Sequence, residues 1–98
     1  MGTRKIVINK CYGGYSLSKE AIDLYIKYSG RDKSEINEWG GNIQRDDPIL
    51  IRVVEELGDR ANGEFAELKI IEIPDDVDWV IEEYDGLEWV AEKHRVWG

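Results

Sequence analysis

Residues 6–18, with the sequence IVINKCYGGYSLS, predict a short strand, a glycine-containing loop and the start of a helix. The first three residues are consecutive and β-branched, a pattern typical of a strand that is buried on both faces and central in its sheet. Gly13-Gly14 permits backbone conformations that other residues resist, and Ser18 is a favourable N-cap. A glycine loop that leads into a helix N-terminus is suited to hold an anion.

Apolar residues recur at helical spacing after Ser18, which predicts a helix that ends at Gly30. Residues 31–45 are polar, and an unstructured loop of that length is unusual inside a compact domain. We therefore expect this segment to form a short edge strand or an exposed functional loop.

A second helix is predicted to begin at Asp47-Pro48, because an acidic N-cap followed by proline favours the first helical turn. Its apolar residues again follow helical spacing. Gly58 either ends this helix or is tolerated within it, and Asn62-Gly63 provides a stronger stop.

The rest of the chain has the pattern of three strands, at residues 65–73, 78–84 and 87–97. Asp85-Gly86 predicts a two-residue hairpin turn between the last two strands. Counting outward from the turn gives three cross-strand pairs on one face: Tyr84 with Leu87, Glu82 with Trp89, and Val80 with Ala91. This face is mostly apolar, so we expect it to pack on the helices. The predicted fold is α+β, with two helices packed on a mixed or antiparallel sheet of about four strands that ends in a β-hairpin.

The length and composition of the chain limit its organisation. With 98 residues it is too short for two cores, so residues 1–98 are expected to form a single compact domain. No apolar run approaches the roughly 20 residues of a membrane helix, and the first residues lack a secretory signal segment. The single Cys11 has no partner for an internal disulfide, which fits a reducing compartment. We therefore expect a protein of the cytoplasm that is not attached to a membrane.

The net charge of −8 disfavours general nucleic-acid binding, because the phosphate backbone attracts a basic surface. The charge is unevenly distributed: residues 1–19 contain four basic residues and no acidic one, whereas residues 31–98 contain eight basic and nineteen acidic residues. A patch without acids in an acidic protein can concentrate a small anion. In the alternative explanation, the uneven charge distribution arises by chance and the negative net charge serves only solubility.

Residues 9–18 are therefore the candidate site for a small anionic ligand. Lys10 would face a phosphate group, and Tyr12 and Tyr15 would stack on a base. The basic residues near the C-terminus would widen the site if the last strand lies beside the first. The candidate ligand-binding residues are Asn9, Lys10, Cys11, Tyr12, Gly13, Gly14, Tyr15, Ser16, Ser18, His94, Arg95 and Trp97. In the alternative interpretation the loop is an ordinary tight turn, and the tyrosines fill the edge of the core.

A catalytic interpretation would use Cys11 as a nucleophile and His94, the single histidine, as its base. Nothing in the sequence brings these residues together, and a buried cysteine that fills space is the favoured interpretation. One cysteine and one histidine without ligand spacing do not indicate a metal site. We therefore predict a protein that is not an enzyme and has no catalytic residue, metal or cofactor.

Three segments carry a family resemblance: VINKCYGGYSLS at residues 7–18, RDDPILIRVVEELG at 45–58 and EEYDGLEWVAEKHRVW at 82–97. Together they resemble a family of small, mostly uncharacterised proteins encoded by tailed phages. The resemblance implies a phage accessory protein that is made in the cytoplasm of a bacterial host. Proteins of this kind often counteract host defence, either by blocking a defence protein or by sequestering a nucleotide signal.

Three functional hypotheses follow. The leading one is a non-enzymatic phage protein that sequesters a small anionic immune signal, such as a cyclic nucleotide, and forms a homo-oligomer that encloses the ligand. The second is an inhibitor or adaptor that binds a host protein through an acidic face. The third is an enzyme that uses Cys11 and His94. The acidic face of the second hypothesis consists of Glu82, Glu83, Glu88 and Glu92.

Overall fold

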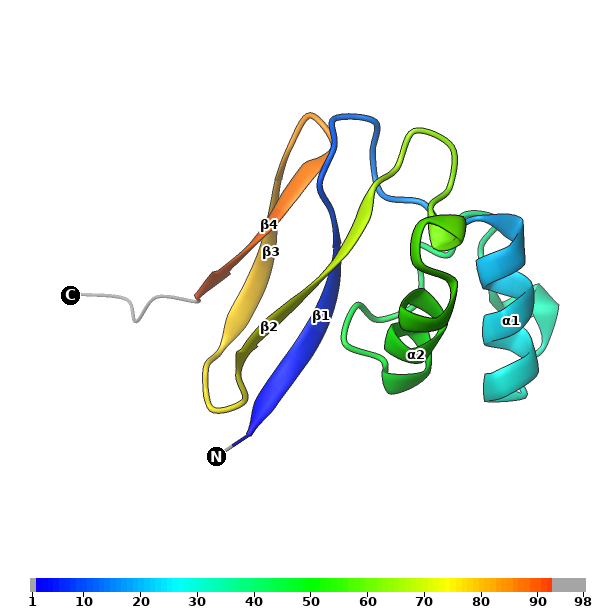
Figure 1. The fold of residues 1–98 in the computed structure, drawn as a ribbon, viewed down its shortest axis with the longest axis horizontal. Coiled ribbons are helices and arrows are strands. Elements are labelled where there is room, and N and C mark those ends of the chain that lie inside the picture. Colours follow the sequence, from blue (N-terminus) through cyan, green and yellow to red (C-terminus); the bar gives the residue numbers. More distant parts are fainter. Residues whose placement is uncertain (1, 93–98) are drawn as a thin grey trace.

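The computed structural model describes residues 2–92, and Figure 1 shows their arrangement. Two α-helices and four strands confirm the predicted α+β fold, with a β-hairpin as the last described part. The predicted last strand ends at Glu92 within the described residues, and its continuation from residue 93 lies outside them. The elements in chain order are β1 (Thr3–Asn9), α1 (Lys19–Ser29), the 3-10 turn η1 (Lys33–Glu35), α2 (Pro48–Leu57), the 3-10 turn η2 (Gly58–Ala61), β2 (Leu68–Pro74), β3 (Trp79–Tyr84) and β4 (Leu87–Glu92).

The described strands form two antiparallel pairs rather than one continuous sheet. β1 pairs with β2 along its whole length, from Thr3 opposite Pro74 to Asn9 opposite Leu68. β3 pairs with β4. In Figure 1 the β1–β2 pair lies between the helices and the β3–β4 hairpin, so the molecule has three layers.

This arrangement buries residues 6–9 of β1 on both faces, as the β-branched run predicted. The prediction that β1 is central in its sheet was wrong, because among the described strands it pairs with β2 alone. Val7 belongs to the core cluster that includes the helix residues. Ile6 and Ile8 point to the opposite face because side chains alternate along a strand, and they are 0% and 1% exposed. The β3–β4 hairpin lies on the side of the β1–β2 pair that is away from the helices (Figure 1).

The hairpin has the predicted register, with all three expected pairs in place. Asp85 and Gly86 have φ of 52° and 93°, the left-handed conformations that a type I′ turn requires at both central positions. The Asp85-Gly86 signal therefore determines the pairing of β3 with β4.

The prediction of which hairpin face packs inward was wrong. Val80, Tyr84 and Trp89, on the face expected to meet the helices, are 37%, 69% and 38% exposed. Glu88, on the other face, is 6% exposed. The hairpin can turn this carboxylate inward because Arg45 forms an ion pair with it.

β2 begins at Leu68, three residues later than predicted. Phe65 has φ of 67°, a conformation that cannot continue a strand, and it is 74% exposed. The amide of Ala66 donates to the carbonyl oxygen of Gly63 at 3.1 Å. The turn signalled by Asn62-Gly63 therefore extends through Phe65.

Both helices begin at the predicted residues; α1 ends at the predicted Gly30, whereas α2 ends at Gly58, the weaker of its two predicted stops. The Ser18 hydroxyl accepts a hydrogen bond from a first-turn amide of α1 at 3.1 Å, and Gly30 ends the helix with φ of 73°. The Asp47 carboxylate caps two first-turn amides of α2, and Gly58 ends that helix before η2. Within residues 2–92, neither helix combines the length and the apolar character needed to cross a lipid bilayer.

Residues 31–45 do not form the short edge strand that was one of the two predictions for them. Asp32 caps η1 in a capping box, and Asn42 bonds back to two backbone positions of the same segment. Ile36 and Ile43 are 9% and 2% exposed and anchor the segment in the core. The polar side chains thus supply the local hydrogen bonds that a strand would take from a neighbour.

Candidate functional site

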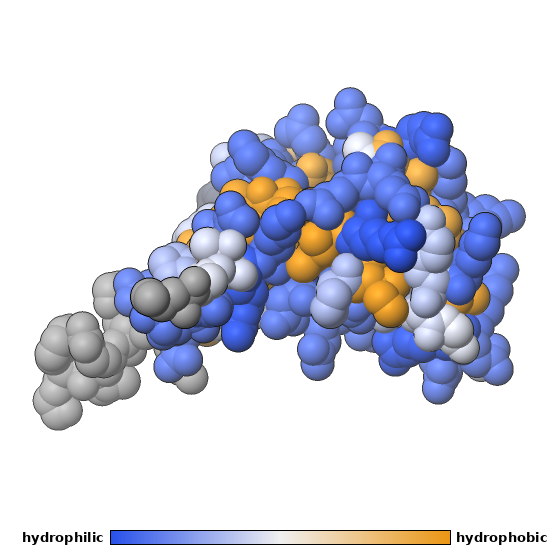
Figure 2. Space-filling view, turned by 60° about the horizontal axis from the view of Figure 1, so that its bottom comes forward, coloured by the Kyte–Doolittle hydropathy of each residue, from blue (hydrophilic) through white to orange (hydrophobic). Residues whose placement is uncertain are grey.

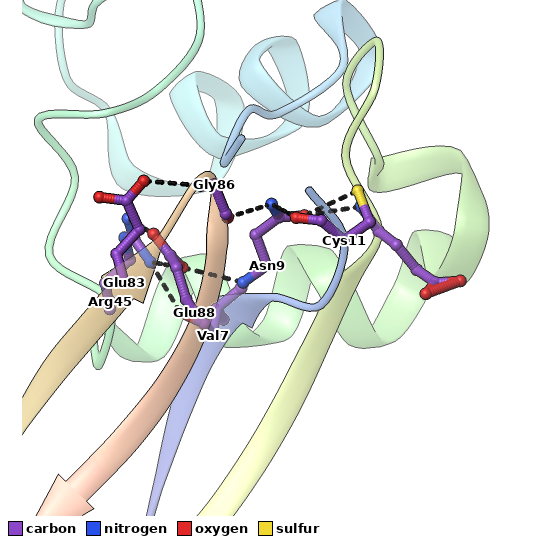
Figure 3. Close-up of polar contacts among 8 residues, drawn as sticks. Val7, Asn9, Cys11, Arg45, Glu83, Gly86 and Glu88 are labelled. Atoms are coloured by element: carbon purple, nitrogen blue, oxygen red, sulfur yellow. Dashed lines mark hydrogen bonds and ion pairs between the residues drawn. The ribbon is translucent and has the colours of Figure 1, made fainter. Parts of the chain in front are cut away.

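The predicted loop is held by Asn9, which is fully buried at the end of β1. Its Nδ2 donates to the carbonyl oxygens of Cys11 and Gly86, both at 2.8 Å (Figure 3). Its Oδ1 accepts from the Glu67 amide at 2.8 Å. One side chain thereby ties β1 to the hairpin turn and to the segment that precedes β2.

A buried ion pair lies beside Asn9. The two guanidinium Nη atoms of Arg45 contact the two carboxylate oxygens of Glu88 at 2.5 and 2.8 Å, and these side chains are 18% and 7% exposed. The same carboxylate accepts the backbone N–H of Asn9 at 2.9 Å (Figure 3). Burying two charges is unfavourable unless they are paired and their other hydrogen-bonding positions are filled. The contacts of this pair meet that condition.

Arg45 also covers the edge of β1 that faces β4. The Val7 N–H donates to the Arg45 carbonyl oxygen at 2.9 Å, and Arg45 Nη1 donates to the Val7 carbonyl oxygen at 3.3 Å. Arg45 thus makes two bonds that a neighbouring strand would otherwise make. We call Asn9, Arg45 and Glu88 the polar junction, because their side chains attach the hairpin to β1.

Tyr15 lies against the polar junction. The Arg45 guanidinium is 3.5 Å from the centroid of its ring, which is a cation–π contact. Tyr15 is 9% exposed, and its buried hydroxyl has no hydrogen-bond partner within residues 2–92. Burial raises the pKa of Tyr15 to about 12, with a smaller lowering by Arg45 and a smaller raising by Glu88. The structure therefore places Tyr15 in the core rather than on a surface where a base could stack.

Tyr15→Phe is expected to stabilise the protein by about 1 kcal/mol at neutral pH, because it removes a buried hydroxyl without a partner. The folded-state pKa of Tyr15 lies above the usual value of 10.0, so its protonation favours folding. This contribution is fully present below about pH 10, and about 2–3 kcal/mol is lost as the pH rises to about 12. Urea unfolding across this range should show a shallower alkaline decline for Tyr15→Phe than for the wild type. Equal slopes would contradict this assignment.

Cys11 and Gly13 hold the loop against Phe65. The thiol of Cys11 donates to the Phe65 carbonyl oxygen at 2.8 Å. A Cβ on Gly13 would lie 1.9 Å from that same oxygen, so glycine is required for this close approach. The structure thus gives both residues a packing role in the loop.

Ser16 and Ser18 bind the loop to the chain around η2. Their hydroxyls donate to the carbonyl oxygens of Glu64 and Arg60, at 3.3 and 2.6 Å. Gly14, with φ of 95°, has open space where a Cβ would point. Most polar groups of the predicted site are therefore bonded to other parts of the protein.

Lys10 is the predicted site residue that lines a groove. The groove has a volume of about 460 Å³ and is also lined by Lys69, Asp59, Glu67 and Leu68. Its two carboxylates offset its two ammonium groups. The remaining predicted site residues lie outside the described part of the chain: His94, Arg95 and Trp97.

A group of exposed aromatic residues was not predicted. Phe65, Tyr84 and Tyr12 are 74%, 69% and 63% exposed, each on or beside a different loop. The loops touch, because Gly13 packs on Phe65 and a Cβ on Gly86 would lie 2.6 Å from the Tyr12 carbonyl oxygen. Figure 1 shows the three loops at the same end of the molecule, at the top of the view. We call Tyr12, Phe65 and Tyr84 the aromatic end.

The backbone at Phe65 is unusual for a bulky residue, since φ of 67° lies in the left-handed region. Strained backbone of this kind is concentrated at functional sites, where the surrounding structure enforces it. Here the Cys11 thiol and the turn that begins at Gly63 enforce it. The Asn62-Gly63 turn signal could have placed Phe65 outside the strand.

The charges near the aromatic end are mostly acidic. Glu64 precedes Phe65, while Glu83 and Asp85 flank Tyr84, and all three acidic residues are exposed. On the other side of the molecule the surface is mixed: Figure 2 brings the bottom of Figure 1 forward and shows apolar patches bordered by hydrophilic side chains. The aromatic end is thus set apart by exposed rings within a negative surrounding.

The acidic face of the second hypothesis does not form one surface. Glu88 is 6% exposed and bound to Arg45, so it cannot contact a partner. The hairpin register places Glu82 on the outer face, and Glu83 on the same face as Glu88. Of the other three, Glu82 and Glu83 are exposed near the turn, and Glu92 is exposed at the far end of β4.

No protein-family model, curated protein or solved structure matches this chain. Among residues 2–92, no three histidine, cysteine, aspartate or glutamate side chains gather closely enough to hold a metal ion. Two described surfaces distinguish the molecule: a loop whose polar groups are largely bonded internally, and an end with three exposed aromatic residues.

Proposed function

We propose that this chain is a non-enzymatic binding protein that attaches to a basic, partly apolar surface of another protein through the aromatic end. The observation that carries the proposal is the exposure of Tyr12, Phe65 and Tyr84 on three loops that touch one another. Aromatic side chains bury a large area for few rotatable bonds and dominate the energetics of interfaces.

The polar junction supports this proposal because it makes the base of the aromatic end rigid. Asn9 bonds to the loop that carries Tyr12 and to the turn beside Tyr84. Its Oδ1 also accepts from the chain that follows Phe65. Loops that are fixed before binding lose less conformational entropy when a partner arrives.

The exposed acids around the aromatic end favour a basic partner, since complementary charge accelerates association and excludes wrong partners. In the context that the phage resemblance implies, the partner would be a host defence protein that this protein blocks in the bacterial cytoplasm. No chemical step is required for such an activity.

The proposal is tested by placing a photo-crosslinking amino acid at Phe65 and illuminating bacteria that make the variant. A specific crosslinked protein should be recovered, identified by mass spectrometry and purified. Its affinity for the unmodified chain should fall at least about tenfold in Phe65→Ser and Tyr12→Ser, as expected for central aromatic contacts.

Trp39→Ser is the matched control, because Trp39 is also an exposed aromatic residue, at 49%, but lies in the 31–45 segment. It should leave the affinity unchanged. Equal affinities of the wild type, Phe65→Ser and Tyr12→Ser for the purified partner would refute the proposal.

A small anionic ligand such as a nucleotide signal is the second candidate. Lys10 and Lys69 line the groove beside the predicted loop and favour an anionic ligand. Asp59 and Glu67 line the same groove and disfavour an anion, so this candidate function ranks second. Mass spectrometry of the denatured protein, with calorimetry across cyclic mono-, di- and trinucleotides, should then reveal a bound nucleotide. Absence of binding in all these experiments would eliminate this candidate.

A further inference from the structure

We infer that the outer face of the β3–β4 hairpin recognises a cationic side chain of the protein partner, preferably arginine. This inference rests on the proposed function and adds the chemistry that the partner must present. The face is continuous with the aromatic end, because Tyr84 belongs to both. It consists of Val80, Glu82 and Tyr84 from β3 and Leu87, Trp89 and Ala91 from β4.

Glu82 lies at the centre of this face. The register places it directly opposite Trp89, with Val80 and Tyr84 two residues away on either side. Opposite residues in an antiparallel pair have Cβ atoms about 4.5–5.5 Å apart. Trp89 and Tyr84 are 38% and 69% exposed, so both rings are accessible beside the carboxylate.

Among residues 2–92, no cation forms an ion pair with the Glu82 carboxylate. Residues 79–92 contain no lysine or arginine. An arginine side chain fits such a surrounding because its planar guanidinium stacks on an aromatic face and donates parallel bonds to a carboxylate. A lysine would satisfy the charge but not the planar contacts.

The charge also argues against other occupants of the face. A second copy docked about a two-fold axis would bring two acidic hairpins together, with Glu82 facing its own equivalent. A purely apolar partner would bury the carboxylate without a counter-ion, which is unfavourable. A protein segment that contains arginine removes both penalties.

The inference is tested with a hexa-arginine peptide as the probe and with hexa-citrulline as its neutral isostere. Binding is followed by NMR in about 0.15 M salt, where long-range attraction is screened. The reporter is the indole N–H of Trp89, assigned by Trp89→Phe. Hexa-arginine should shift this signal saturably, together with backbone amides of β3 and β4, and hexa-citrulline should not.

Glu82→Gln should weaken the binding of hexa-arginine at least about tenfold, since the charged hydrogen bonds are lost. Glu38→Gln is the matched control, because it removes the same charge from an exposed position in the 31–45 segment. It should change the affinity less than about twofold. Because Glu82 is exposed, unchanged midpoints of thermal unfolding should show that both variants are folded.

An equal loss of affinity in Glu82→Gln and Glu38→Gln would overturn the inference, as would peptide-induced shifts spread evenly over the acidic surface. If neither peptide shifts Trp89 while crosslinking at Phe65 still identifies a partner, the arginine site is wrong and the proposed function stands. If hexa-arginine binds at Trp89 and substitutions at the aromatic end leave partner affinity unchanged, the proposed function fails instead.

Discussion

Arg45→Ala should lower the free energy of unfolding by about 3–5 kcal/mol, a large part of the total stability of a small domain. The substitution leaves the carboxylate of Glu88 buried without its counter-ion. It also removes the donor to the Val7 carbonyl oxygen and the cation–π contact with Tyr15. Urea unfolding followed by fluorescence and circular dichroism measures the loss.

The matched control is Arg52→Ala. Arg52 also forms an ion pair, with Glu56, and a cation–π contact, with Tyr28, but these side chains lie at the surface. Its loss should change stability by at most about 1 kcal/mol. The double variant Arg45→Met/Glu88→Leu should recover most of the stability lost in Arg45→Ala, because apolar residues can replace a buried ion pair. A loss below about 1 kcal/mol in Arg45→Ala would contradict the assigned role of the pair.

Asn9→Ala should destabilise the protein by about 3 kcal/mol, because it leaves several buried backbone groups without partners. These groups are the carbonyl oxygens of Cys11 and Gly86 and the amide of Glu67. The hairpin turn loses its attachment to β1 in the same step. Hydrogen exchange should therefore accelerate in β3 and β4 more than in α1.

Asn9→Asp is a sharper version of this experiment. Aspartate has nearly the same shape but cannot donate, so it would oppose two carbonyl oxygens and lie near the Glu88 carboxylate. We expect it to destabilise at least as much as Asn9→Ala. Asn37→Ala, at an exposed position, should have little effect. A wild-type stability for Asn9→Asp would show that the donor role is unimportant.

The features that were predicted correctly are encoded in neighbouring residues. Ser18, Asp47-Pro48 and Gly30 define helix ends through bonds or conformations within one turn. The Asp85-Gly86 turn likewise fixes the hairpin register without reference to any other part of the chain. Such local signals do not depend on how the rest of the chain folds.

The features that were mispredicted depend on residues far apart in the sequence. The hairpin face was inverted because Glu88 is satisfied by Arg45, which lies 43 positions earlier. In the sequence pattern, an unpaired glutamate on that face argues for solvent exposure. Phe65 combines both kinds of signal: the local Asn62-Gly63 turn could have placed it outside the strand, and the bond from Cys11, 54 positions earlier, holds it there.

The candidate site also has features that local sequence predicts and features that depend on distant contacts. The residue types of the 9–18 loop indicated an anion site, yet the structure engages Asn9, Cys11 and Ser18 in bonds to distant parts of the chain. The exposed aromatic residues form a group because three loops meet in space, and no spacing in the sequence records that meeting. Tyr12 was considered for stacking, but its neighbours in the fold were not predictable.

The position of β1 between two layers has a consequence for how the chain folds. Thr3 pairs with Pro74 and Asn9 with Leu68, so β1 leaves the ribosome well before β2 and cannot form this pairing until β2 has been synthesised. Contacts of such long sequence separation slow folding, because a long loop must close before they form. During this interval Ile6, Val7 and Ile8 are exposed as an apolar, unpaired strand that other nascent chains could join. The residue order that buries β1 between two layers of the finished protein thus exposes it to aggregation during synthesis.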